Sequence, residues 1–135
     1  MEKYEILEHL ADLKIRAFGK NKKELFLNML KGMVDSQKPE IEDKKINKRK
    51  IEIKSIDLSN LLVDFLSEIL YLSQVNREAY QNFKFKNFSD KEVYGDLFGQ
   101  KVKRFGEDIK AITYYSLDIH QRRDGVWEAT VLFDI

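Results

Sequence analysis

Carboxylates near the two ends of this sequence are the side chains best suited to bind a metal ion. Asp12 begins a stretch of alternating residues, on the side opposite the apolar row, and Asp134 precedes the C-terminal residue, Ile135. Two side-chain carboxylates, the terminal carboxylate and a backbone carbonyl would suit a hard cation such as Ca²⁺, which takes about six to eight oxygen ligands. The spacing by itself does not place the first and last strands side by side.

Other kinds of catalytic site have little support. The chain has no cysteine, which excludes disulfides, thiolate zinc sites and a cysteine nucleophile. Glycine-rich phosphate loops, a GxSxG elbow and an HExxH helix are also absent from the sequence. Of the two histidines, His9 shares the parity of the apolar row and is expected to be packed or to cap, and His120 lies beside a predicted turn and is expected to be exposed. Most common enzyme classes therefore lack support, and a metal-dependent hydrolase would need a base near the ion, for which the sequence offers no persuasive candidate.

Length and composition predict a single domain over residues 1–135. Hydrophobic residues make up 43% of the chain, and 24 basic against 23 acidic residues leave a net charge of +1, which implies no overall attraction to nucleic acid or membrane. Charged residues interrupt the N-terminal segment where a signal peptide would need an apolar stretch, and the apolar region at residues 61–72 is shorter than the roughly 20 residues that span a bilayer. We expect a soluble, cytoplasmic protein.

The residues that follow Asp12 predict a strand and then a helix. From residue 11 to residue 18 the side chains alternate with a period of two, and Gly19 ends the strand. Asn21 and Glu24 resemble a capping box. Apolar residues then recur at helical spacing and predict an amphipathic helix over about residues 22–35, with Phe26, Met29, Leu30, Met33 and Val34 on one face.

The middle of the chain predicts a loop, a strand and the strongest helix. Residues 38–47 contain the only proline and are expected to form a loop, which leads into a strand at about residues 49–56. Asp57 can cap the next helix. Its main apolar stripe runs through Leu58, Leu61, Leu62, Phe65, Ile69 and Leu72, and Leu66 and Leu70 widen it. We therefore expect this helix to be covered on more than one side.

The C-terminal half predicts four strands. Alternation at residues 83–85, 92–98, 109–120 and 126–135 indicates them, and Asp-Gly at residues 124–125 is a strong hairpin signal. Residues 99–106, bounded by glycines, are predicted to form a basic surface loop. This order of elements predicts an α+β fold with a mostly antiparallel sheet and two helices packed on it.

Charged segments leave alternatives open. Asp64 and Glu68 lie four residues apart on the second helix and could share a cation or bind a partner's lysine, although a solvated helix face also explains them. The basic segments at residues 44–54 and 101–105 would suit an RNA-binding module, although lysines are also typical of strand edges. A chaperone-like interaction domain is another alternative, because sheet edges and apolar grooves are generic binding surfaces.

Four blocks of the sequence resemble the archease family. Residues 4–12 (YEILEHLAD) with residues 14–19 (KIRAFG) are similar to the start of archeases, where a His-Thr-Ala-Asp motif precedes the first strand. Residues 61–72 (LLVDFLSEILYL) resemble the family's central helix, residues 110–115 (KAITYY) its Lys-Ala-Val-Thr-Tyr-His strand, and residues 131–135 (VLFDI) its C-terminal strand. The blocks follow the order of the family and cover essentially the whole chain.

The resemblance implies a function and a set of site residues. Archeases are non-catalytic helpers of the GTP-dependent RNA ligase that joins tRNA exon halves in splicing; they promote guanylylation of the ligase and multiple turnover. The implied partner is therefore this ligase, with tRNA reached through it and no membrane involved. By position, the family's metal-binding residues are Asp12, Asp134 and, through its backbone carbonyl, Ile135, and the implied ion is a divalent metal, Ca²⁺. Lys110, at the start of its strand, is a candidate for contact with the ligase.

Two positions depart from the family motifs. Leu10 stands where the first motif has threonine, and Tyr115 stands where the later motif has histidine. A two-residue turn at residues 124–125 would set Tyr115 directly opposite Asp134 on one face of the sheet. We therefore expect Tyr115 to donate a hydrogen bond to the Asp134 carboxylate without ligating the metal. His9 is likewise expected to lie next to the metal ligands without binding the metal itself.

Overall fold

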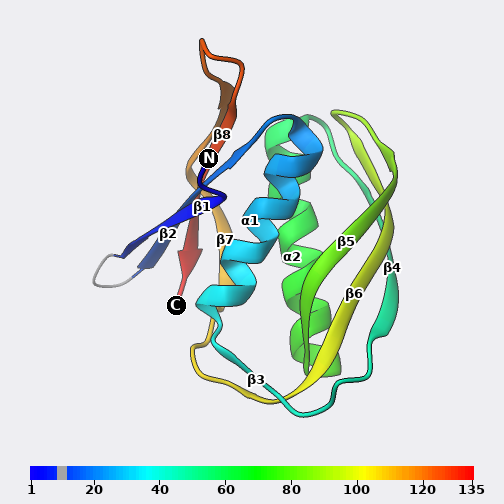
Figure 1. Cartoon of the computed structure of the whole chain (residues 1–135). Helices are drawn as coiled ribbons and strands as arrows, with labels where there is room; N and C mark the ends of the chain where they lie inside the picture. The colour runs from blue at the N-terminus through cyan, green and yellow to red at the C-terminus, as the bar shows by residue number, and fades with distance from the viewer. Residues whose placement is uncertain (9–11) are drawn as a thin grey trace.

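The computed structural model describes residues 1–8 and 12–135. These residues form two α-helices and eight β-strands (Figure 1). In chain order the elements are β1 (Tyr4–Glu8), β2 (Asp12–Gly19), α1 (Lys22–Ser36), β3 (Pro39–Ile41), β4 (Asn47–Lys54), α2 (Leu58–Asn76), β5 (Glu78–Phe88), β6 (Glu92–Phe105), β7 (Ala111–Gln121) and β8 (Trp127–Asp134). In the described part of the chain, neither helix is long and apolar enough to cross a membrane.

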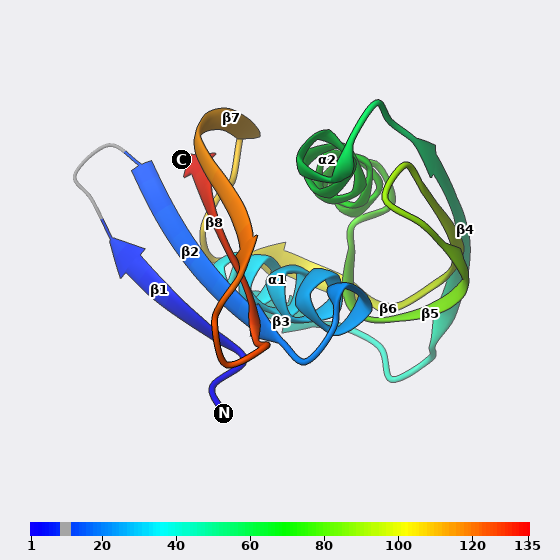
Figure 2. The same cartoon turned by 90° about the horizontal axis from the view of Figure 1, so that it is seen from above.

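The strands form two antiparallel sheets, and the helices lie between them. The first sheet has the order β1-β2-β8-β7; in the second, β6 pairs with β3, β4 and β5. Figures 1 and 2 show α1 and α2 in the space between the two sheets. The predicted α+β class and antiparallel pairing are confirmed. The helices pack on one face of each of two sheets, because the apolar surface of α2 is wide enough to contact both.

Helix α1 begins where its capping residues predicted. The Asn21 side chain accepts a hydrogen bond from the Glu24 backbone N–H at 2.9 Å, and the Glu24 carboxylate accepts one from the Lys20 N–H at 3.3 Å. The first bond satisfies a backbone donor that the first turn of a helix leaves unpaired, and the second ties the residue before the cap to that turn. Asn28 is buried and donates to the Phe18 carbonyl at 2.7 Å, which ties α1 to the end of β2.

Helix α2 also follows its predicted cap. The Asp57 carboxylate accepts a hydrogen bond from the Asn60 backbone N–H at 2.8 Å. The helix ends at Asn76, and the left-handed backbone of the capping residue Arg77 (φ 54°) turns the chain into β5. Its buried residues include Leu61, Leu62, Phe65 and Ile69 of the predicted stripe, and Leu66 and Leu70, which widen it; Leu58 and Leu72, at the ends of the stripe, are partly buried. Five rings fill the space between α1, α2 and β5, with neighbouring centroids 4.8 to 6.4 Å apart: Phe26, Phe65, Phe83, Phe85 and Phe88.

Three segments differ from the sequence-based prediction. Strand β1 was not predicted, and it pairs along its length with β2. The expected loop at residues 38–47 contains the short strand β3, in which Pro39 occupies the first position, where a strand tolerates proline. The expected loop at residues 99–106 is wrong, because β6 continues to Phe105. Pairing with β3 and β5 holds this part of β6, and such long-range partners leave no mark on local composition.

The loop of the β7–β8 hairpin is longer than the two-residue turn that the sequence predicted. The Gly125 N–H donates to the Arg122 carbonyl at 3.0 Å, and the Arg122 N–H donates to the Val126 carbonyl at 2.8 Å, so the loop consists of residues 123–125. This is a type I turn followed by a left-handed glycine (φ 88°). Further along, residues 114–117 of β7 bulge out opposite a single residue of β8, Val131. Loop and bulge together set the register of the hairpin.

Candidate metal centre

The carboxylates at the two chain ends lie opposite each other in the first sheet. Asp12 is the first residue of β2 and Asp134 the last of β8, and the register of these antiparallel strands pairs one with the other. Directly opposed residues of an antiparallel pair project from the same face of a sheet. The C-terminus accordingly lies beside the start of β2 (Figures 1 and 2). The fold therefore joins two residues whose proximity the spacing could not establish.

A third strand holds the end of β8 in place. The Lys110 backbone N–H, just before β7, donates to the Asp134 carbonyl at 2.8 Å. Ala111, the first residue of β7, is the cross-strand partner of Asp134. Asp134 thus lies between β2 and β7, which fixes the backbone of the C-terminal strand up to its last residues.

A pocket of about 280 Å³ lies beside this junction. Its charged side chains come from Asp12, Asp35, Glu107 and Lys38, and Ile135 also lines it. The Asp12 Oδ1 atom is buried and has no hydrogen-bond partner among the described residues. A buried acceptor without a partner costs about 1–3 kcal/mol, and more when the group is charged. A cation bound at Asp12 would supply the missing interaction.

The oxygen atoms at this junction supply only some of the ligands that a hard cation needs. Oxygen atoms of Asp12, Asp134 and the C-terminal Ile135 are the ligand type that Ca²⁺ prefers. However, within residues 1–8 and 12–135 no three His, Cys, Asp or Glu side chains come together closely enough to hold a metal. The remaining ligands of an ion bound here would therefore be water or atoms of a partner molecule.

Asp35, which lines the same pocket from the end of α1, is held by Tyr4 of β1. The Tyr4 hydroxyl donates a hydrogen bond to the Asp35 carboxylate. This bond, together with burial, raises the pKa of Tyr4 to about 12, so the hydroxyl stays protonated and keeps donating near neutral pH. This pair was not expected from the sequence, because it depends on β1, which was not predicted.

Lys110 lies exposed at the entrance to β7, next to the backbone of Asp134. None of the ion pairs formed by the described residues includes Lys110. A second hollow, between α2 and β7, includes Lys110 and Tyr71 in its lining. The side chain is available to a partner, and its contact with a ligase stays a prediction.

Tyr115 does not lie opposite Asp134, and the predicted pairing is wrong. Ala111 occupies that position. Tyr115 lies in the β7 bulge, 74% exposed, and its backbone N–H donates to the Thr113 hydroxyl at 2.7 Å. The prediction assumed a two-residue turn and a regular ladder, whereas the longer loop and the bulge move the register by four positions. The predicted positions of His9 and Leu10 lie outside the described residues.

Asp64 forms hydrogen bonds within the fold. Its carboxylate accepts hydrogen bonds from the Ser55 hydroxyl at 2.6 Å and from the Tyr114 hydroxyl at 2.8 Å. The hydrogen bond to Asp64 raises the pKa of Tyr114, and burial raises it to a lesser extent. Asp64 thereby connects α2 to β7 and to the segment after β4, and of the two acidic residues proposed to share a cation, it already has partners within the chain.

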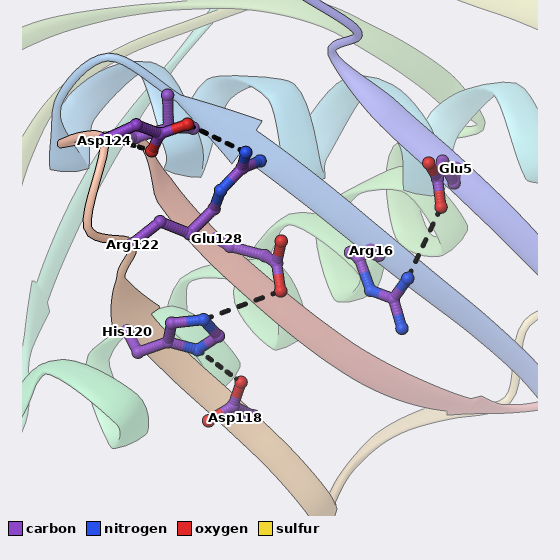
Figure 3. Close-up of polar contacts among 8 residues, drawn as sticks. Glu5, Arg16, Asp118, His120, Arg122, Asp124 and Glu128 are labelled. Atoms are coloured by element: carbon purple, nitrogen blue, oxygen red, sulfur yellow. Dashed lines mark hydrogen bonds and ion pairs between the residues drawn. The ribbon is translucent and has the colours of Figure 1, made fainter.

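The outer face of the first sheet carries charged side chains that pair with one another (Figure 3). Arg16 of β2 lies 3.5 Å from Glu5 of β1. The His120 ring lies between two carboxylates, with Nδ1 2.7 Å from Asp118 and Nε2 3.6 Å from Glu128. His120 is exposed, as predicted from its place beside the turn. Each basic side chain labelled on this face therefore lies beside at least one carboxylate.

The chain is similar to known proteins over nearly its full length. Residues 4–135 match the archease protein family. The chain is 37% identical to the protein archease of Methanosarcina barkeri, over 99% of this chain and 97% of that one, and 32% identical to that of Pyrococcus furiosus, over the whole of both chains.

Two solved structures have the same fold. The solution structure of protein 1598 of Methanobacterium thermoautotrophicum superposes with a TM-score of 0.71 at 23% identity, over the whole of both chains. The crystal structure of an archease, described as a possible chaperone, from Thermotoga maritima gives a TM-score of 0.68 at 20% identity, covering 96% of this chain and 94% of that one. The four sequence blocks, the family match and the identity to these relatives agree, and the chain belongs to the archease family.

Proposed function

We propose that this protein is a non-catalytic activator of the GTP-dependent RNA ligase that joins tRNA exon halves, and that it promotes ligase guanylylation and multiple turnover. Membership of the archease family supports this role. The observation that carries the proposal is the pairing of Asp12 with Asp134 across β2 and β8, together with the buried, unpartnered Oδ1 of Asp12. These features would concentrate negative charge at one exposed end of the first sheet.

Asp12, Asp134 and the backbone carbonyl of Ile135 would hold a divalent metal at this end, and their oxygen atoms match Ca²⁺. When bound, such an ion supplies charge screening next to phosphate groups as a nucleophile attacks them. The chain's own residues position the carboxylates through the β2–β8–β7 ladder. Because the chain contributes few ligands, coordination positions stay free for oxygen atoms of the ligase, which suits a helper protein better than a structural metal site.

Lys110 completes the proposed contact surface. Its exposed ammonium group lies beside the strand end that carries Asp134. A positive side chain next to a carboxylate pair would favour one orientation of an acidic ligase segment over others. We therefore place the ligase-facing surface at the start of β7 and the end of β8.

The direct test is ligase turnover. The protein is added to its cognate ligase with RNA in excess, and the ligated products per ligase molecule are counted for the unaltered protein, Asp134→Ala and Asp90→Asn. Asp90 is a matched control because it is an exposed aspartate that pairs with Lys22 at the far end of β5. We expect multiple rounds with the unaltered protein and with Asp90→Asn, and few with Asp134→Ala. Full activation by Asp134→Ala contradicts the metal role, and a single round with the unaltered protein contradicts ligase activation itself.

A further inference from the structure

The outer face of the second sheet presents a group of residues far from the paired carboxylates. The helices cover the inner face of β4, β5 and β6, and Figure 2 shows no element over the outer face. On β6, Val93 and Leu97 are buried in the core, so the alternate residues Tyr94, Asp96 and Phe98 belong to the outer face. This face is therefore a sheet surface that carries two aromatic rings and meets solvent.

The strand register surrounds these rings with lysines and amides. Phe98 lies between Lys48 of β4 and Asn82 of β5, and in the next row Asp96 lies between Lys50 and Lys84. Side chains directly opposite one another on neighbouring strands are about 4.5–5.5 Å apart at Cβ. Phe98 therefore has one lysine directly opposite it and two more in the adjacent row.

The one carboxylate in the row of Lys50 and Lys84 forms an ion pair with a fourth lysine. The Asp96 carboxylate is buried and lies 3.1 Å from the Lys86 ammonium group. None of Lys48, Lys50 and Lys84 belongs to an ion pair among residues 1–8 and 12–135. This differs from the outer face of the first sheet, where the charges drawn in Figure 3 pair with one another. An excess of positive charge therefore gathers around Phe98 although the whole chain carries a net charge of only +1.

Of the two rings, Phe98 is the one left open. The Lys86 ammonium group lies 5.9 Å from the centre of the Tyr94 ring and covers it. Phe98 instead lines a hollow of about 350 Å³, together with Ile46, Gln81, Asn82 and Gln100. The Gln100 amide donates to the Lys44 carbonyl and the Asn82 oxygen accepts from the Phe83 N–H, so the Gln81 amide, the Asn82 NH₂ group and the Gln100 oxygen are the groups open to a ligand. An aromatic ring beside amide donors and acceptors is the combination by which proteins stack a base and bind its edge.

We propose that this outer face, centred on Phe98 and surrounded by Lys48, Lys50 and Lys84, binds single-stranded RNA. The ring stacks on one base, the amides of the hollow hydrogen-bond to its edge, and the lysines contact the neighbouring phosphates. An acidic protein would also be attracted by the lysines, but it would not need an open ring beside amide groups that can bind a base edge. The inference goes beyond the proposed ligase role and rests on none of its residues.

The test measures RNA binding by the full chain without any ligase. Fluorescence polarisation follows a labelled oligouridylate of roughly ten nucleotides, within the size range that single-strand binding surfaces cover. Phe98→Leu keeps an apolar side chain on the sheet and is expected to weaken binding by at least about fivefold through lost stacking. The double variant Lys48→Glu, Lys50→Glu is expected to weaken binding at low salt and to reduce the slope of log affinity against log salt by about 1.4.

The control is Lys20→Glu, Lys23→Glu, which changes the net charge equally at two exposed lysines near the start of α1. It is expected to bind nearly as well as the unaltered protein, and ultraviolet cross-linking should join the RNA to the β6 segment that contains Phe98. Failure of the unaltered protein to bind RNA at low salt overturns the proposal, as does an equal loss in the control. Equal binding of polyglutamate, unaffected by Phe98→Leu, would assign the surface to an acidic protein instead.

Discussion

Arg49 of β4 and Glu78 of β5 form a two-pronged ion pair at the edge of the core. Arg49 Nε donates to one carboxylate oxygen at 3.0 Å and Nη2 to the other at 3.1 Å, and the Tyr80 hydroxyl donates to the same carboxylate at 2.6 Å. Asn76 in turn donates to the Tyr80 hydroxyl at 3.0 Å. Burial alone would raise the pKa of Glu78, but the hydrogen bonds from Arg49 and Tyr80 hold it below its ordinary value. The network joins the end of α2 to two strands of the second sheet.

Arg49→Met is expected to destabilise the protein by roughly 1–3 kcal/mol, because it leaves the Glu78 carboxylate, 4% exposed, without its charge partner. The matched control is Arg104→Met, whose pair with Glu40 is exposed on both sides (76% and 51%) and should cost less than about 1 kcal/mol. Urea unfolding at neutral pH measures both free energies. Equal losses in the two variants would show that burial of Glu78 does not set the cost.

Acid should weaken the same network. The folded-state pKa of Glu78 is lowered from its ordinary value of 4.5, so its contribution to stability is complete above that value and is lost as the pH falls through the lowered pKa. We expect Glu78→Gln to be less stable than the unaltered protein at neutral pH and to lose less stability on acidification. Unfolding free energies measured at a series of pH values from 7 downward test this, and parallel pH profiles for the two proteins would contradict it.

Alkali should act through two tyrosines. Burial and the hydrogen bond to Glu78 raise the pKa of Tyr80 to about 12, and the hydrogen bond to Asp35 raises that of Tyr4 to about 12. Because the fold favours the neutral hydroxyls, their contribution is complete below the ordinary pKa of 10.0 and declines as the pH rises from there through about 12. Ultraviolet titration of tyrosinate should show a late phase that Tyr80→Phe and Tyr4→Phe each reduce. A single step near pH 10 in the folded protein would contradict it.

Calcium should stabilise the protein through its chain ends. Binding to the folded state alone adds about 2.7 kcal/mol when the free ion is at 100 times its dissociation constant, so the melting temperature should rise with Ca²⁺ and fall again with a chelator. Asp12→Asn is expected to abolish this rise, whereas Asp90→Asn, at the exposed ion pair with Lys22, should keep it. Differential scanning fluorimetry measures the shift. A rise retained in Asp12→Asn would place the ion elsewhere.

Gly125→Ala is expected to destabilise the β7–β8 hairpin by about 1 kcal/mol. Gly125 has a φ of 88°, which side chains with a Cβ rarely adopt, and a Cβ placed there would meet nothing within 4 Å. The cost is therefore conformational and not steric, so Gly125→Asn should be tolerated better than Gly125→Ala. Thermal unfolding of both variants tests this order, and equal losses would point to a cause other than backbone conformation.

Local features of the chain were predicted well from the sequence. Asn21 and Asp57 cap the two helices as expected. The residues after Asp12 form a strand in which, at the start, every second side chain is buried in the core. A helix cap needs only a side chain and the next backbone amides, and periodicity needs only one buried face. Such features are complete within a few residues, so their order along the chain predicted the α+β class.

Long-range pairing decided the remainder. Strand β1 and the second half of β6 are held in strand conformation by hydrogen bonds to other strands. Ala111 lies opposite Asp134, where Tyr115 was expected, because of one extra loop residue and a bulge. The sequence alone determined that Asp12 starts one strand and Asp134 ends another. Only the tertiary structure decided that the two face each other, because cross-strand register depends on every turn and bulge between the partners and on the packing of both helices between two sheets.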